Sequence, residues 1–342
     1  MKKTCPFNLK KAQPRILWEI TSKCNLKCRH CLYYTESPQI VTDLSYKQIC
    51  EIVDKISEDG RIKEIWISGG EPLVRKDIYK IINYMSAKGL IPSISTNGTL
   101  ITDESAKELY AGGIRYAHVS IDGVWPQTHD ELRGVEGSFE KTIKGVKAMN
   151  TAGIETGVSF MVTEASIGQV KKMVELAKEA NMSVVSFYMV EPLGRAVVNE
   201  FGEREFLANE LKKQKVDIEV EYKDLGKRIE FPRLFDLDMD VLEECHAEKF
   251  LTITADGKLG VCPWLMKSQG KFEGRELLTT SFSSAWNDCV EYVQKMKEAR
   301  KEQQTCKKCQ FNESCGQGCP AVSIYSGKYP RGFDSACRSF YD

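Results

Sequence analysis

Several features that mark other classes of protein are missing from this sequence of 342 residues. The basic start, MKKTCPF, leads into no apolar segment, so there is no secretory signal peptide. No apolar run approaches the roughly 18 residues that a membrane-spanning helix needs. The 48 basic residues do not outnumber the 48 acidic ones, and the two kinds are interleaved, which argues against nucleic-acid binding. These absences predict a cytoplasmic protein with no nucleic-acid and no membrane partner.

Cysteine, in contrast, is abundant, with thirteen residues in the chain. In a protein of the cytoplasm such a number favours metal or redox chemistry over a disulfide framework. Cys24, Cys28 and Cys31 form one group near the N-terminus, and most of the others fall in the last hundred residues. The sequence therefore predicts a cysteine-poor body with a cysteine cluster at each end.

The body alternates short β-branched segments with amphipathic segments. The strands are expected at 15–21, 64–68, 91–96, 116–121, 155–163 and 183–190. Between them, apolar residues recur with helical spacing, as in Ile49, Ile52, Val53 and Ile56. Six alternations of strand and helix predict parallel βα units in an α/β fold. We interpret this as a partial (β/α)6 barrel, although an open doubly wound sheet would show the same order of strands and helices along the sequence.

Polar and glycine-rich segments follow three successive strands, at 68–72 (SGGEP), 95–98 (STNG) and 120–123 (SIDG). Each one alone is explained by the need to turn the chain. In a barrel, however, functional loops gather at the carboxyl ends of the strands. Three such ends in succession predict a ligand site there.

The first cysteine group directly follows the first strand, with the spacing C-x3-C-x2-C. Three thiolates can hold a [4Fe–4S] cluster and leave one iron open for a cofactor or substrate. The alternative is a structural zinc site, which normally takes four ligands. His30 would then be the fourth ligand, but it adjoins Cys31, so that simultaneous ligation is geometrically awkward.

This cysteine motif after the first strand, together with Gly-Gly-Glu-Pro after the second, resembles the radical SAM superfamily over about residues 15–195. The resemblance implies that Cys24, Cys28 and Cys31 hold a [4Fe–4S] cluster whose open iron chelates S-adenosylmethionine (SAM). It also implies an enzyme that reductively cleaves SAM to a 5′-deoxyadenosyl radical, which abstracts a substrate hydrogen. The physiological reductant would be a low-potential carrier such as flavodoxin or ferredoxin.

The same resemblance assigns contacts to SAM. It implies that Gly69, Gly70 and Glu71 hold the amino group of the methionine moiety, and that His30 contacts adenine. Arg133 would pair with the SAM carboxylate, a role that suits the planar guanidinium. Contacts to ribose and methionine are expected from Asn97, Ser120 and Asp122.

The C-terminal cysteines include a C-x2-C-x5-C-x3-C run at 306–319, preceded by a predicted β-hairpin at 251–261. The Asp256-Gly257 pair favours a type I′ turn in that hairpin. The spacing alone fits a zinc ribbon as well as iron–sulfur sites. However, the arrangement of seven C-terminal cysteines resembles the SPASM extension of radical SAM enzymes. This resemblance implies two auxiliary [4Fe–4S] clusters. Cluster I would use Cys245, Cys262 and Cys319, and cluster II would use Cys306, Cys309, Cys315 and Cys337.

Some relatives carry an additional cysteine just before the first of these seven, where this chain has Asp238, Met239 and Asp240. We therefore expect auxiliary cluster I to have only three protein thiolates, unless Cys5 or Cys289 supplies a fourth. The expected organisation is an N-terminal extension (1–14), a radical SAM barrel (15–195), a bridging segment (196–240) and a SPASM domain (241–342).

The substrate is the least determined property. The resemblance favours modification of a ribosomally made peptide or protein side chain by cross-linking, oxidation, epimerisation or decarboxylation. The short segment 1–14 leaves no room for a leader-recognition domain, so a separate protein would perform that task. The alternatives are a tetrapyrrole side-chain modification in haem biosynthesis and, in a different class, a non-catalytic iron–sulfur electron carrier.

Overall fold

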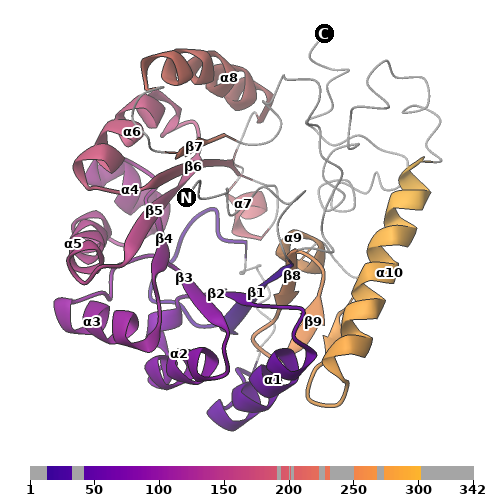
Figure 1. Cartoon of the computed structure of the whole chain (residues 1–342). Coiled ribbons are helices and arrows are strands. Elements are labelled where there is room, and N and C mark those ends of the chain that lie inside the picture. Colours follow the sequence, from indigo (N-terminus) through magenta and orange to yellow (C-terminus); the bar gives the residue numbers. More distant parts are fainter. Residues whose placement is uncertain are drawn as a thin grey trace.

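The computed structural model describes residues 14–32, 42–190, 194–199, 201, 204–222, 228–231, 250–267 and 273–301. Its centre is a parallel sheet of consecutive strands, with helices between them on the outside (Figure 1). The strands are β1 (Arg15–Thr21), β2 (Glu64–Gly69), β3 (Ile91–Thr96), β4 (Tyr116–Ser120), β5 (Glu155–Val162), β6 (Val184–Met189) and β7 (Arg228–Glu230). The helices are α1 (Tyr46–Asp59), α2 (Ile78–Ala87), α3 (Asp103–Gly112), α4 (Pro126–Arg133), α5 (Ser138–Thr151), α6 (Val170–Glu179), α7 (Arg195–Val198) and α8 (Arg204–Glu221).

The order of the strands decides between the two folds that the sequence allowed. From β1 to β7 the spatial order is the sequence order, and every neighbouring pair is parallel. A doubly wound sheet reverses its order at a switch point, so that its helices cover both faces. Here every right-handed crossover advances in the same direction, which puts α1, α2, α3, α5, α6 and α8 on the outer face, whereas α7 lies at the cysteine loop (Figure 1). The prediction of a partial barrel is confirmed, and the six predicted strands agree with β1–β6 within two residues.

The hydrophobic core lies between the sheet and the helices. Strand residues that face the helices are buried; Ile65, Ile94, Val119 and Val158, for example, have no exposed surface. Local signals fix the helix ends: in α1, Ser45 and Gln48 form a capping box, and Gly60 takes the left-handed conformation after the last turn. Because these signals are local, a helix at this place could be predicted from the sequence.

The sheet continues beyond residues 15–195. Strand β7 comes from the predicted bridging segment and pairs with β6, and β8 (Phe250–Ile253) comes from the predicted SPASM segment and pairs with β1. Beyond β8 follow β9 (Lys258–Gly260), α9 (Pro263–Lys267), β10 (Arg275–Glu276) and α10 (Phe282–Lys301). Strands β8, β9 and β10 extend the sheet at the edge opposite to β7, and α10 lies beside β9 (Figure 1).

The hairpin of β8 and β9 forms as predicted, but its turn differs. A type I′ turn requires left-handed backbone at both central residues. Gly257 has φ of 91°, whereas Asp256 is not in the left-handed region. The Gly257 amide donates to the Thr254 carbonyl, and Thr254 and Lys258 bond to each other across a three-residue loop. The prediction of a type I′ turn is therefore wrong, because one more residue enters the loop and only the glycine must be left-handed.

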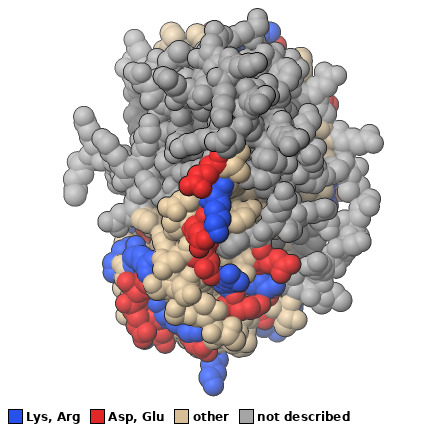
Figure 2. All heavy atoms as spheres, turned by 90° about the vertical axis from the view of Figure 1, so that its right-hand side faces the viewer, with Lys and Arg blue, Asp and Glu red and all other residues tan. Residues whose placement is uncertain are grey.

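Charges of both signs are interspersed over the described part of the face that carries α10 (Figure 2). Two pairs on this face are Lys295–Glu291 and Arg275–Asp288. Among the described residues, no helix is both long enough and apolar enough to cross a membrane.

Candidate SAM and iron–sulfur site

The loop after β1 carries Cys24, Cys28 and Cys31, all of them half-buried and none of them in a disulfide. Asp43 holds the start of the loop: its carboxylate accepts hydrogen bonds from the Ser22 amide and the Ser22 hydroxyl, both at 2.8 Å. Burial raises the pKa of Cys24 to about 11, and the negative charges of Cys28, Cys31 and Glu71 act in the same direction. The three sulfur atoms therefore lie close enough to influence one another, and a bound metal would replace their protons.

The segment after β2 packs directly against this loop. The Gly70 amide donates to the Thr21 carbonyl at 2.9 Å, and the Glu71 amide donates to the Lys23 carbonyl at 2.8 Å. A Cβ atom on Gly70 would lie 2.1 Å from the Lys23 oxygen, and one on Gly69 would lie 2.3 Å from the Thr21 oxygen. Both glycines are thus required by the close approach of two backbones, in addition to any contact with SAM.

Glu71 is buried, with 1% of its surface exposed, and its carboxylate joins two strand ends. It accepts hydrogen bonds from the Asn97 amide at 2.7 Å and from the Thr96 hydroxyl at 2.8 Å. Asn97 in turn donates through its side chain to Asn25 in the cysteine loop, at 2.9 Å. The structure thus brings Glu71 and Asn97 together, and their contacts with SAM stay a prediction.

Asp122, which follows β4, is the centre of a second buried network. Its Oδ2 lies 2.7 Å from Nη2 of Arg133 and 3.4 Å from Nε2 of His30. Nη1 of Arg133 donates to Sγ of Cys28 at 3.6 Å, so the guanidinium bridges the carboxylate and the cysteine loop. Arg133 is therefore held beside the sulfur atoms, and its pairing with the SAM carboxylate stays a prediction.

His30 is neutral at neutral pH. Burial lowers its pKa to about 4, although Asp122 acts in the opposite direction. Its Nδ1 is buried and has no hydrogen-bond partner in the part of the chain that is described. A buried nitrogen of this kind fits a ligand that supplies the missing bond, as the predicted adenine contact would. Ser120, the remaining predicted contact, ends β4 and is half-buried.

The sequence analysis did not predict the hydrogen bonds that join the cysteine loop to α7 and to the end of α4. The Arg195 amide donates to the Cys31 carbonyl at 3.0 Å, and the Asn199 side chain donates to the Arg29 carbonyl at 2.9 Å. On the other side, the Lys27 and Arg29 amides donate to carbonyls at the end of α4. These are bonds to the backbone, which leave no residue-type signal in a sequence.

The donor set fits an iron–sulfur cluster better than a lone ion. Among the described residues, no three His, Cys, Asp or Glu side chains converge to hold a single metal ion. Each thiolate of an iron–sulfur cluster binds a different iron, so the cluster needs its sulfur atoms more widely spaced. The three cysteines lie on one loop that is held from both sides, so the loop can present one thiolate to each of three irons.

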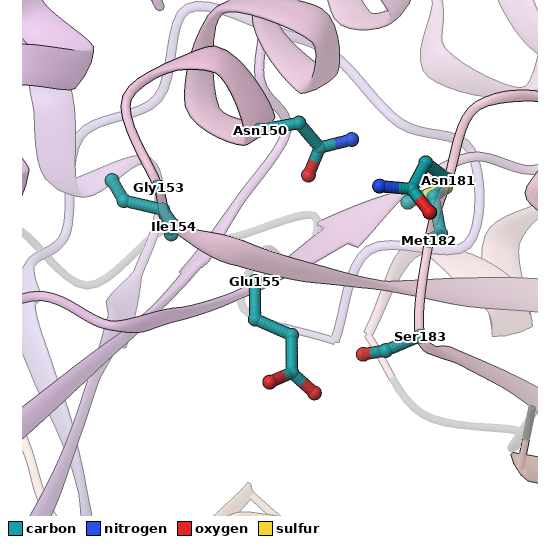
Figure 3. Close-up of a pocket in the computed structure, with 7 residues that line it drawn as sticks. All are labelled: Asn150, Gly153, Ile154, Glu155, Asn181, Met182 and Ser183. Carbon is teal, nitrogen blue, oxygen red and sulfur yellow. The ribbon is translucent and has the colours of Figure 1, made fainter.

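A hollow of about 420 Å³ lies at the other end of the barrel (Figure 3). It is lined by Asn150 and Gly153 at the end of α5, by Glu155 at the start of β5, and by Asn181 and Ser183 before β6. Asn150 is already engaged, because it donates to the Ala180 carbonyl and accepts from Thr156. We therefore assign no function to this hollow.

Of the predicted ligands of the auxiliary clusters, the described part of the chain contains Cys262, half-buried just before α9. The others lie outside the described residues: Cys245, Cys306, Cys309, Cys315, Cys319 and Cys337. Cys5, Asp238, Met239 and Asp240 also lie outside them. Cys289 is fully buried in α10, with Sγ 3.9 Å from the Leu259 carbonyl, and burial raises its pKa to about 12. This thiol has the surroundings of a packed core residue.

Comparison with known proteins identifies the family to which the barrel belongs. Residues 18–177 match the family model of the radical SAM superfamily. The chain carries a radical SAM domain. The cofactors of this superfamily, a [4Fe–4S] cluster and SAM, are therefore the cofactors of the domain.

The individual relatives fall into two groups. An AdoMet-dependent heme synthase of Methanosarcina barkeri is 35% identical over 53% of this chain and 52% of its own length. The chain thus spans about half the length of that relative. The antilisterial bacteriocin subtilosin biosynthesis protein AlbA of Bacillus subtilis is 28% identical over 92% of this chain and 68% of its own length.

The fold is also that of a solved structure, Streptococcus suis SuiB bound to its precursor peptide SuiA. The TM-score is 0.78, with 18% identity over 95% of this chain and 75% of SuiB. At this identity the likeness shows the fold alone.

Proposed function

We propose that this protein is a radical SAM enzyme with a SPASM extension, and that it modifies a side chain of a peptide or protein. When bound, the cluster and SAM supply an electron and a 5′-deoxyadenosyl radical that abstracts a substrate hydrogen. The observation that carries the proposal is the cysteine loop packed against Gly69 and Gly70, with Arg133 beside Cys28.

The residues of the chain have distinct parts in this proposal. Cys24, Cys28 and Cys31 would hold the cluster, because they are reduced cysteines in one loop that is held from both sides. His30 would bind adenine through its buried Nδ1, and Arg133 would hold the SAM carboxylate near the cluster. The buried carboxylate of Asp122 keeps Arg133 in position, since a fixed guanidinium loses less entropy on binding an anion.

The choice of a peptide substrate rests on the extent of the similarities. AlbA, a bacteriocin biosynthesis protein, aligns with 92% of this chain, whereas the heme synthase aligns with 53%. SuiB, whose fold this chain shares, binds a precursor peptide. The higher identity to the heme synthase, 35%, keeps a tetrapyrrole substrate as the second candidate. A separate leader-recognition protein and a flavodoxin or ferredoxin are the proposed partners.

In the SPASM segment we propose two auxiliary clusters. Cys245, Cys262 and Cys319 would hold cluster I, and the other four cysteines of the motif would hold cluster II. The buried position of Cys289 supports a cluster I with three protein thiolates, because α10 would have to unpack to release that thiol.

The test is anaerobic reconstitution with iron and sulfide, reduction with dithionite in the presence of SAM, and measurement of 5′-deoxyadenosine by mass spectrometry. We expect product from the native chain and none from Cys24→Ala/Cys28→Ala/Cys31→Ala. Cys50→Ala is the matched control, since Cys50 lies in α1, and it should retain the activity. No product from a fully loaded native sample would favour the electron carrier.

A further inference from the structure

Arg75 directly follows the short turn 72–74 after the Gly-Gly-Glu segment, and its side chain is only 9% exposed. The guanidinium makes five hydrogen bonds, one for each N–H that it carries. Nη1 donates to the Ile20 carbonyl at 2.9 Å, and both Nη1 and Nη2 donate to the Leu44 carbonyl at 3.0 Å. The Asp77 carboxylate accepts the other two bonds, both at 2.9 Å. Arg75 thus ties the end of β1, the residues before α1 and the start of α2 to one another.

Asp43 holds the two residues that follow Ile20. Its carboxylate accepts hydrogen bonds from the Thr21 hydroxyl and from the amide and hydroxyl of Ser22. Burial raises the pKa of Asp43, but these hydrogen bonds and the charge of Arg75 outweigh burial and bring the pKa below its ordinary value. The carboxylate is therefore ionised at neutral pH, and an ionised acceptor makes stronger hydrogen bonds than a neutral one.

The segment that carries Asp43 is itself fixed to the hairpin of β8 and β9. The amide of the next residue, Leu44, donates to the Ala255 carbonyl at 3.0 Å. The Leu44 side chain is buried against the hairpin turn, since a Cβ atom on Gly257 would lie 3.1 Å from it. Asp43 and the carbonyl that accepts from Arg75 therefore belong to a segment that is bonded on both sides.

All these contacts meet at the point where the two predicted SAM-binding segments join. The Thr21 carbonyl accepts from the Gly70 amide at 2.9 Å, and the Lys23 carbonyl accepts from the Glu71 amide at 2.8 Å. Cys24 follows Lys23 directly. A shift of residues 20–22 would therefore move Cys24 relative to the Gly-Gly-Glu segment, although neither Arg75 nor Asp43 is itself a predicted ligand of the cluster or of SAM.

We propose that Arg75 and Asp43 are positioning residues for SAM, and that together they form a brace that keeps the cysteine loop in the arrangement that binds the cofactor. This inference rests on the proposed function and adds these two residues to it. When a loop occupies its binding arrangement for only a fraction of the time, the apparent dissociation constant rises in inverse proportion to that fraction. The loss of one hydrogen bond to a charged group changes such an equilibrium by about tenfold or more.

The test measures SAM binding by calorimetry on the reconstituted, oxidised holoenzyme under anaerobic conditions, with each sample normalised to its iron content. We expect Asp43→Ala to weaken binding by about tenfold, because all of its hydrogen bonds to the strand end are lost. Asp43→Asn keeps a carbonyl oxygen for the Ser22 amide and should recover part of this loss. An Asn variant as weak as the Ala variant would contradict a brace made of hydrogen bonds.

Arg75→Lys tests the other half of the brace. It should also weaken SAM binding, because an ammonium group cannot reproduce the planar fork of five donors. Arg115→Lys is the matched control: Arg115 also donates to two backbone carbonyls, those of Tyr110 and Ile114, but it precedes β4 at the opposite end of the barrel. This variant should bind SAM as the native chain does.

Hydrogen exchange of the cluster-free protein gives a second readout, which does not depend on SAM. The amides of Ser22 and Gly70 should exchange faster in Asp43→Ala than in the native chain, because the first loses its acceptor and the second bonds to the loosened strand end. Circular dichroism checks the fold, and if Asp43→Ala does not fold, Arg75→Lys takes its place in both measurements.

Native SAM affinity in both Asp43→Ala and Arg75→Lys overturns the inference, and so does an equal loss in Arg115→Lys. A lower free energy of unfolding at native SAM affinity also overturns it, because the residues would then only stabilise the fold. If the native holoenzyme itself binds no SAM, the proposed function fails, and the exchange rates then decide separately whether Asp43 holds the loop.

Discussion

Replacing Gly70 with alanine tests the packing that holds the cysteine loop. The new Cβ would lie 2.1 Å from the Lys23 carbonyl oxygen, whereas real Cβ contacts essentially never fall under 3.0 Å. The two backbones would therefore have to separate by about 0.9 Å. Because Cys24 follows Lys23, its sulfur atom would move relative to those of Cys28 and Cys31. Overpacking of this kind costs about 1–3 kcal/mol of stability, and a displacement near 1 Å at a reacting centre costs about 100-fold in rate.

The assay is the rate of 5′-deoxyadenosine formation, together with the electron paramagnetic resonance spectrum of the reduced cluster with and without SAM. Gly168→Ala is the matched control, because a Cβ there meets nothing within 4 Å and the residue is exposed. We expect about a 100-fold loss for Gly70→Ala and native behaviour for Gly168→Ala. A Gly70→Ala enzyme with the native rate and the native spectral response to SAM would refute this account of the loop.

Three further predictions concern the buried polar groups. Asp122→Asn leaves the buried Arg133 without its carboxylate, so urea unfolding of the cluster-free protein should show a loss of about 3–5 kcal/mol; a loss under 1 kcal/mol would contradict the importance of the pair. His118 has its pKa lowered from 6.5 to about 4 in the folded state, so only the unfolded chain gains a proton there as the pH falls from 6.5 to 4. Stability should drop over this window by at most about 3 kcal/mol on account of this residue, and His118→Gln should flatten the measured pH dependence. Cys289→Ala should retain the full iron content, whereas Cys262→Ala should lower it; iron loss from Cys289→Ala would assign that thiol to a cluster.

Local patterns made much of the fold predictable. Strands β1–β6 were found from β-branched runs, and α1 from its apolar spacing, because burial against the adjoining layer imposes these patterns directly on the sequence. Strand β7 was missed: it has only three residues, Arg228–Glu230, of which two are charged. Its Glu230 faces the inside of the barrel, where a charge can be accommodated, so the usual sign of a buried strand is absent.

Part of the candidate site could likewise be predicted from the sequence, and part could not. The cysteine spacing and the Gly-Gly-Glu segment were recognisable because a short loop must supply several groups at fixed separations. The contact of Arg133 with Cys28 joins residues 105 positions apart, and no local pattern encodes it. The roles of these residues toward SAM are still predictions, whereas their mutual contacts are structural facts.

By itself, the sequence determined the alternation of strands and helices, the sulfur donors and the ends at which polar groups gather. Only the tertiary structure decided which of these groups meet. Parallel register places Ser186 beside Glu230, and successive right-handed crossovers turn Trp66, His118 and Tyr188 toward the same interior. The physical reason is that the chemistry of each side chain follows from its own residue type, whereas proximity in a parallel sheet depends on the registers and connections of the whole chain.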